Sequence, residues 1–405
     1  MAQGVDVGSV RILSSTIGVQ LAFLVLFLLT GSAISAHGQY QYQELHDFGT
    51  PVGLSGPILD SSGNLYATTS LTDEVFELVM PGDALQVLYT FQGPPDGQEP
   101  RAPLVFDRAG NLYGTTLRGG AYNAGTVFML SPSSGGQWRE RVLYSFTGGA
   151  DGGQPQAAVL LDNAGHLYGT TTAGGRYGQG VVYRLNIAAF PAAVVLHSFG
   201  APGDGSQPTG TVVADTSGNL YGATYAGGAH GEGTVYKLSP LQASFGWAET
   251  ILYSFTGGDD GGNPLGGVVF GPGGNLFGAA VGGGDGCIGG CGAIFELTPQ
   301  PGGNWSESVA YAFTGATGAN PVGPVTFNSA GHLFGVTTFK GAYGTGNVFE
   351  LTPTSDGQWT ETTLYSFNDI LFLTSNGGLV LDGDGNLYGT YNSDDPAAVY
   401  ELIAP

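Results

Sequence analysis

The first residues that could do chemistry are two aspartates in matching loops. Asp151 lies in ADGGQP and Asp204 lies in GDGSQP, each between two short apolar segments. Two carboxylates on neighbouring loops are the groups that a glycan hydrolase or lyase would use. The DGxxP phrase recurs along the chain, however, and an aspartate before glycine is typical of a turn. A carbohydrate-active enzyme is therefore the alternative hypothesis, and no residue is assigned a catalytic role.

A second set of loops, rich in glycine, combines basic residues with tyrosines. The chain has only ten lysines and arginines, and three of them fall in these loops. A tyrosine offers a stacking surface and a hydroxyl, and a nearby cation can orient a sugar or a peptide. We predict a ligand-binding surface from the following residues: Arg118, Tyr122, Arg176, Tyr177, Lys340 and Tyr343. The alternative is that the tyrosines of the recurring GGxYG phrase only pack the loops.

The cysteines and histidines are the remaining candidates for metal or redox chemistry. Cys287 and Cys291 are too few for a structural zinc site and lack CxxC spacing, so a local disulfide is predicted in an exported protein. His46 and His197 replace the tyrosine of a recurring LYSF phrase, which indicates repeat variants and not a ligand set. HExxH, GxSxG and phosphate-loop motifs are absent from the sequence. No metal and no cofactor is predicted.

These loops belong to a repeat that runs through the chain. The phrase GNLYGTT at 110–116 has seven versions, which begin at Gly63, Gly110, Gly165, Gly218, Gly274, Gly331 and Gly385. Each repeat holds four apolar segments rich in Val, Leu, Phe, Tyr and Thr and bounded by Gly, Pro, Asp or Ser, which predicts four β-strands. The first segment is almost continuously apolar, so we expect a strand buried on both faces. The aspartate before each phrase, such as Asp107, is interpreted as a turn residue.

Four-stranded units of this length predict an all-β fold, a β-propeller of seven blades. The seventh copy of the fourth strand, residues 42–48, precedes all the other strands, whereas the last repeat ends at its third strand. The N-terminal strand should therefore complete the last blade and close the ring. In such blades the loops between strands two and three and between strands four and one emerge at the same end. The predicted binding residues should share that rim.

The phrase G-[NH]-L-[YF]-G-T-T-x-x-G-G-x-Y-G-x-G-T-V-[FY]-x-L resembles the GloVer repeat of exported bacterial "choice-of-anchor tandem repeat" proteins. The resemblance covers essentially everything after residue 36. It implies a secreted, bacterial, propeller-like protein, and it transfers no catalytic residue because the activity of the family is not established. Members of this family often end in a surface anchor, whereas this chain ends in AVYELIAP. A freely secreted or periplasmic protein is expected.

Residues 1–36 have the layout of a signal peptide, with Arg11 before an apolar run at 21–31 and small residues at 32–36. An uncleaved N-terminal anchor is the alternative. Residues 37–405 are predicted to form one propeller domain without a membrane span. The formal net charge of −22 disfavours nucleic acid and anionic membranes as partners. We expect a monomer that binds an extracellular glycan or protein.

Overall fold

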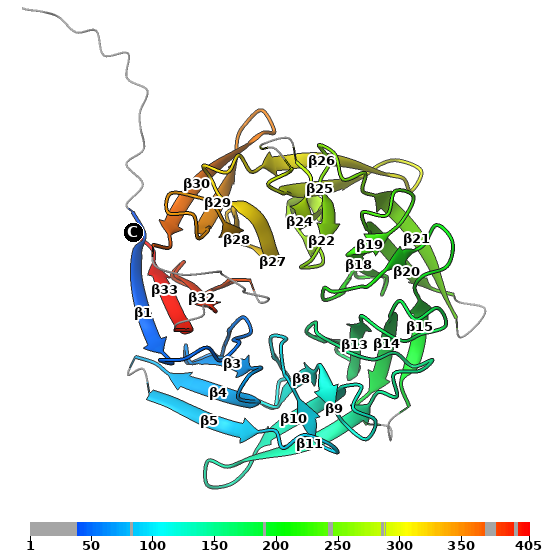
Figure 1. Ribbon diagram of the computed structural model, residues 1–405, viewed down its shortest axis with the longest axis vertical. Helices are drawn as coiled ribbons and strands as arrows, with labels where there is room; N and C mark the ends of the chain where they lie inside the picture. Colours follow the sequence, from blue (N-terminus) through cyan, green and yellow to red (C-terminus); the bar gives the residue numbers. More distant parts are fainter. Residues whose placement is uncertain are drawn as a thin grey trace, which may run out of the picture. The chain divides into compact units, whose positions relative to one another are not determined.

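The computed structural model describes residues 39–81, 84–188, 192–241, 246–284, 287, 289–368, 378–392 and 396–405. The predicted signal peptide, residues 1–36, lies outside these ranges. The strands in these ranges form seven antiparallel blades that follow one another around a ring, which is the seven-bladed β-propeller predicted from the repeats (Figure 1). Within the same ranges, no helix is long and apolar enough to cross a membrane.

Blades one to four each contain four strands in consecutive order. Blade one consists of β2 (Ile58–Leu59), β3 (Leu65–Thr69), β4 (Glu74–Val79) and β5 (Ala84–Thr90). Blade two consists of β7 (Val105–Phe106), β8 (Leu112–Thr116), β10 (Thr126–Pro132) and β11 (Trp138–Ser145). Blade three consists of β12 (Leu160–Leu161), β13 (His166–Thr171), β14 (Val181–Asn186) and β15 (Val194–Ser198). Blade four consists of β17 (Val213–Ala214), β18 (Leu220–Thr224), β20 (Thr234–Pro240) and β21 (Trp247–Ser254).

The other blades vary this plan. Blade five has β23 (Val269–Phe270), a 3-10 turn at Pro272–Gly274, β24 (Leu276–Gly282), β25 (Ala293–Pro299) and β26 (Trp305–Ala312), and β22 (Gly262–Pro264) also pairs with β24. Blade six has β27 (Ala319–Phe327), β28 (Leu333–Phe339), β29 (Asn347–Pro353) and β30 (Trp359–Ser366). Blade seven has β31 (Val380–Leu381), β32 (Leu387–Tyr391), β33 (Ala398–Ile403) and β1 (Gln41–Asp47). Two short pairs join loops: β6 (Gly97–Gln98) with β9 (Arg118–Gly119), and β16 (Gly205–Ser206) with β19 (Ala226–Gly227).

The N-terminal strand closes the ring, as predicted. β1 pairs antiparallel with β33 from Gln41 opposite Ile403 to Asp47 opposite Ala398, and the two strands lie side by side in Figure 1. The junction with blade one is also bonded, because the Thr390 hydroxyl donates to the carbonyl of Ser55 at 2.9 Å. Closure gives blade seven its fourth strand, so that β33 is paired on both sides and β1 takes the outer position.

The recurring GNLY phrase is a hydrogen-bonded turn, which confirms the interpretation of its aspartate. One oxygen of Asp107 accepts the backbone N–H groups of Ala109 and Asn111 at 2.8 and 2.9 Å. The other oxygen accepts the Asn111 amide at 2.7 Å and the Tyr113 hydroxyl at 3.0 Å. The aspartate, the asparagine and the tyrosine of the phrase therefore bind one another, and the turn uses both carboxylate oxygens.

The innermost segment forms a shorter ladder than the sequence predicts. In blade three, Ala157, Ala158 and Val159 are buried, yet β12 contains only Leu160 and Leu161. The carbonyl of Ala157 is bound by the Thr115 hydroxyl of the preceding blade at 3.1 Å. Thr170 makes the same bond to Gly210 of the following blade, also at 3.1 Å. Part of the inner backbone is therefore satisfied across blades instead of within its own sheet.

Aromatic side chains fill the space between blades. Trp247 of blade four lies against Tyr168 of blade three, and Trp305 of blade five lies against Tyr221 of blade four, with ring centroids 6.4 and 6.0 Å apart. The phenylalanine that ends each fourth strand packs on a third-strand aromatic of the next blade, as Phe199 does on Tyr236 at 5.0 Å. Each blade is therefore held by its neighbours through equivalent contacts.

Candidate functional site

The rim of long loops is built by pairing between two loop families. β6 and β16 lie in loops that connect strand four to strand one, and they pair with β9 and β19 in loops that connect strand two to strand three. The two families therefore emerge at the same end of the blades, as predicted. Backbone pairing gives the rim a defined shape, which a surface made of unpaired loops would lack.

The predicted tyrosines lie on this rim and reach the solvent. Tyr122, Tyr177 and Tyr343 are 63%, 43% and 64% exposed. The Arg176 guanidinium lies 5.4 Å from the centre of the Tyr177 ring, a cation–π contact that orients both side chains. Arg118 is less available, because it forms an ion pair with Glu99 at 3.2 Å.

Lys340 is tied to the disulfide that the sequence predicts. Cys287 and Cys291 are bonded, with their Cα atoms 5.7 Å apart. The Lys340 ammonium donates to both sulfur atoms, at 3.2 and 3.3 Å. The predicted binding residues lie two to a loop, on blades two, three and six; blades two and three are neighbours, whereas blade six lies across the ring from them (Figure 1).

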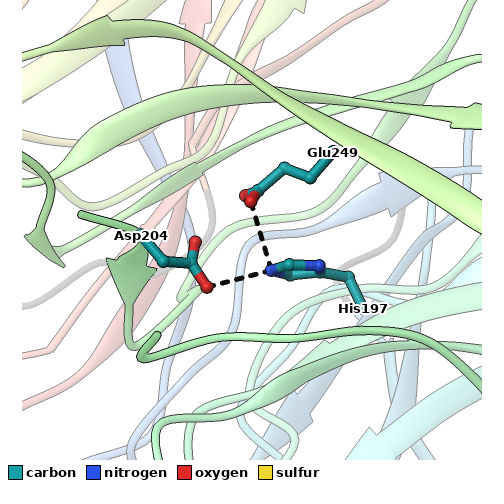
Figure 2. Close-up of side chains that lie close together, drawn as sticks. All are labelled: His197, Asp204 and Glu249. Atoms are coloured by element: carbon teal, nitrogen blue, oxygen red, sulfur yellow. Dashed lines mark hydrogen bonds and ion pairs between the residues drawn. The ribbon is translucent and has the colours of Figure 1, made fainter. Parts of the chain in front are cut away.

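A different cluster lies between blades three and four and includes Asp204, from the loop that leads into β16. Figure 2 shows that His197, Asp204 and Glu249 point toward one another. The His197 Nε2 atom lies 3.1 Å from Asp204 Oδ2 and 3.4 Å from Glu249 Oε2. Their side chains are 20%, 5% and 16% exposed, respectively. We call this group the histidine interface.

Three elements bring the histidine interface together. His197 lies in β15, and a β-bulge just before it inserts one extra residue and changes the local twist. Asp204 is held by its own loop, because it accepts the backbone N–H groups of Gly200 at 3.1 Å and Gly205 at 2.6 Å. Glu249 comes from β21 of the next blade. The cluster exists only when the two blades are packed.

Burial and charge act against each other in this cluster. Burial alone would lower the pKa of His197, but the hydrogen bond to Asp204 and the nearby Glu249 carboxylate raise it. Burial raises the pKa of Glu249, the charge of His197 opposes the rise and the charge of Asp204 adds to it. Glu249 Oε1 is buried without a hydrogen-bond partner among the described residues. Burial of the Glu249 carboxylate therefore costs more free energy than burial of the other two side chains.

The next interface along the chain has a tyrosine in place of the histidine. Tyr253 donates its hydroxyl to Asp260 at 2.9 Å, and burial raises the pKa of Glu307 from blade five to about 7, with a further rise from Asp260. We call this group the tyrosine interface. Equivalent bonds join Tyr89 to Asp96 and Tyr144 to Asp151, both at 2.8 Å. The aspartate of the recurring DG phrase is thus regularly bound by the fourth strand before it.

This pattern explains where the two aspartates of the enzyme hypothesis lie. Asp151 accepts Tyr144, the Thr147 backbone and the Thr147 hydroxyl. Asp204 is bound by His197 in the corresponding place one blade later. Each carboxylate is therefore held within its own interface. His197 and Asp204 lie in separate repeat phrases of the sequence, and Glu249 was not among the predicted site residues. A glutamate recurs four residues before the tyrosine of the fourth strand, as Glu249 does before Tyr253 and Glu307 before Tyr311, and this recurrence is the signal that could have found it.

The opposite rim carries a cavity between blades two and three. Its volume is about 550 Å³, and the turns that begin at Asp107 and Asp162 form part of its wall. Tyr113, Leu161 and Ile187 supply apolar surface. Arg108 bridges the two turns through a 3.0 Å hydrogen bond to Asn163. This cavity lies away from the rim that carries the exposed tyrosines.

Solved structures with the same fold include two lyases and the extracellular domain of a two-component system. A streptogramin B lyase aligns with a TM-score of 0.58 and 13% identity over 91% of this chain and 98% of that chain. Virginiamycin B lyase from Staphylococcus aureus has a TM-score of 0.58 and 14% identity over 90% and 100%. The extracellular domain of a hybrid two-component system from B. thetaiotaomicron has a TM-score of 0.56 and 12% identity over 90% and 41%. At these identities the likeness establishes the fold alone.

Sequence comparison identifies the repeat itself. No curated protein sequence matches the chain. The family described as the Gloeobacter/Verrucomicrobia repeat matches residues 53–257 and 195–402, which together span the propeller. This is the repeat that the glycine-spaced phrase resembles, and its copies form the blades described above. The chain belongs to the Gloeobacter/Verrucomicrobia repeat family.

Proposed function

We propose that this protein is an exported propeller that binds an extracellular glycan or protein on its long-loop rim without transforming it. The observation that carries the proposal is the exposure of three tyrosines at matching places of that rim, Tyr122, Tyr177 and Tyr343. Exposing a large aromatic side chain to water is unfavourable, and such exposure is favoured where a ligand covers the ring. Arg176 beside Tyr177 adds a charged donor that can fix the orientation of a sugar or a peptide.

Export is part of the proposal. A signal peptide at 1–36 would place the chain in an oxidising compartment, where the Cys287–Cys291 disulfide persists. The extracellular domain of the two-component system, which has the same fold, gives a precedent for propellers outside the cell. A monomer is the proposed state, because the ring is closed by its own N-terminal strand.

A hydrolase or lyase that uses Asp151 and Asp204 is the weaker candidate. Both carboxylates already accept several hydrogen bonds from their own interface. Hydrogen bonds to Asp151 offset its burial and keep its pKa below the usual value. A general acid requires the opposite shift, toward a carboxyl group that holds its proton near neutral pH.

The test is a glycan array probed with the mature protein, followed by affinity measurements on any glycan that binds. The double variant Arg176→Ala/Tyr177→Ala should weaken binding at least about fivefold, since a contact worth about 1 kcal/mol is removed. Arg108→Ala on the opposite rim is the matched control and should leave affinity unchanged. Equal affinity in the double variant, or loss in the control, would place the ligand elsewhere. Turnover of a bound glycan would support the enzyme instead.

A further inference from the structure

We propose that His197, Asp204 and Glu249 form a binding site for a divalent metal ion, Zn²⁺, between blades three and four. None of these three residues is among the proposed ligand-binding residues, so the site does not depend on the proposed function. One nitrogen and two carboxylate oxygens are ligands that zinc commonly takes in proteins. The proposed metal would join the end of β15, the loop at Asp204 and β21.

The distances between the candidate ligand atoms fit a tetrahedral site. Nε2 of His197 lies 3.1 Å from Asp204 Oδ2 and 3.4 Å from Glu249 Oε2. Zinc bonds of about 2.0–2.1 Å at tetrahedral angles separate two ligand atoms by about 3.3 Å. The three candidate atoms all lie within 4.8 Å of one another. Only small side-chain movements are needed to bring all three to bonding distance of one ion.

The surroundings hold the imidazole in place for this role. The His197 ring meets the Phe199 ring edge-on, with centroids 4.6 Å apart, and Phe199 is itself buried. This packing fixes the ring while its Nε2 atom faces both carboxylates (Figure 2). A metal ion on Nε2 requires the neutral imidazole with its proton on Nδ1, so a protonated His197 would release one proton to solvent when the ion binds.

The charges of the cluster also favour the binding of a cation. Two carboxylates face a single imidazole, so when both carboxylates are ionised even a protonated His197 leaves the group with a net negative charge. A divalent ion supplies the missing positive charge beside Glu249, whose Oε1 atom has no hydrogen-bond partner among the described residues, as is also true of Glu307 Oε1. His197 and Glu249 are partly exposed, so a water molecule can reach the fourth tetrahedral position.

The tyrosine interface supplies the internal comparison. It has the same aspartate and glutamate positions, Asp260 and Glu307, but Tyr253 presents a hydroxyl that donates to Asp260. A neutral phenol is not a common zinc ligand, whereas imidazole is. The proposed site is therefore specific to the histidine interface. Tyrosine, which the repeat has at this position in the neighbouring blade, should abolish the site when it replaces His197.

The experiment measures binding of ZnCl₂ to the chelator-treated, full-length mature protein by calorimetry, with Co²⁺ absorbance as a check on coordination. The native protein should bind one equivalent. His197→Tyr, which restores the residue of the neighbouring blade, should weaken zinc binding at least about tenfold. Its melting temperature in chelator should stay close to that of the native protein, so loss of binding would not reflect unfolding.

Two further variants make the result decisive. Tyr253→His should create a second site with Asp260 and Glu307 and raise the stoichiometry from one to two. His332→Asn, which restores the GNL phrase elsewhere, is the control for adventitious histidine binding and should change nothing. The proposal is overturned if the native protein binds no zinc, or if it binds zinc with the same affinity after His197→Tyr.

Discussion

The histidine interface and the tyrosine interface occupy adjacent junctions of one ring, and they are built from the same repeat positions. They differ in one residue type: His197, Asp204 and Glu249 in the first, Tyr253, Asp260 and Glu307 in the second. Either residue can donate a hydrogen bond to the buried aspartate, so both satisfy the packing of the blades. Only the imidazole adds a nitrogen that can bind a metal. A repeat protein can thus acquire a site by one substitution without disturbing its scaffold.

The largest expected effect tests whether the two interfaces share a scaffold. Trp247→Ala and Trp305→Ala each remove an indole that packs on the second-strand tyrosine of the preceding blade. Each variant should lose about 3 kcal/mol of unfolding free energy, near the low end for a large aromatic because both indoles are half-buried. Urea denaturation measures both losses. A difference between them of more than about 1.5 kcal/mol would contradict the equivalence.

Replacing the aspartate should destabilise the histidine interface more than the tyrosine interface. Asp204 is 5% exposed and accepts two backbone N–H groups and His197. Asp260 accepts the Thr256 backbone, the Thr256 hydroxyl and Tyr253 in a more exposed loop. We expect Asp204→Ala to cost about 2–3 kcal/mol and Asp260→Ala about 1 kcal/mol less, because unpaired buried donors cost more than exposed ones. Equal losses in urea denaturation would show that burial does not distinguish the two.

The pH dependence of the tyrosine interface follows from Glu307. Burial raises the pKa of Glu307 to about 7, above its value of 4.5 in an unfolded chain, so the folded state binds the extra proton between these pH values. The contribution of Glu307 is therefore fully present below the unfolded pKa and lost as pH rises through the folded pKa.

Replacing Glu307 with glutamine should remove this loss. Glu307→Gln should become more stable than the native protein by about 1 kcal/mol at pH 8, a value reduced for its partial exposure, and should not differ at pH 4. Melting temperatures across that range measure the effect. A constant difference between the two proteins at all pH values would mean that Glu307 does not titrate as inferred.

The smallest effect concerns the hydroxyl of the tyrosine interface. Tyr253→Phe removes one hydrogen bond to Asp260, which keeps its two bonds from Thr256. The expected loss is about 0.5–1 kcal/mol in urea denaturation. Tyr144→Phe, which removes the matching bond to Asp151, is a control that should give a similar loss. A much larger loss in one variant would show that the hydroxyl has a role beyond the shared packing.

The fold was open to prediction because its signals are local. Asp107, Asn111 and Tyr113 bind one another within seven residues, so the phrase that forms the turn can be recognised wherever it recurs. The same holds for the disulfide, whose cysteines are four positions apart. The predicted length of the inner strands was wrong. Hydrogen bonds from threonines of neighbouring blades replace part of the ladder, as at Ala157.

Sequence patterns alone predict the seven repeats, their four strands and the N-terminal strand that closes the ring. Each of these depends on apolar patterning and turn residues that are contiguous in the chain. Which side chains meet between blades depends on how the blades pack, and it could not be predicted from the sequence. His197 and Glu249 lie on strands of different blades, and a bulge and the packing of two sheets set their distance. Such a contact has no local pattern, because it is fixed by the rotation from one blade to the next.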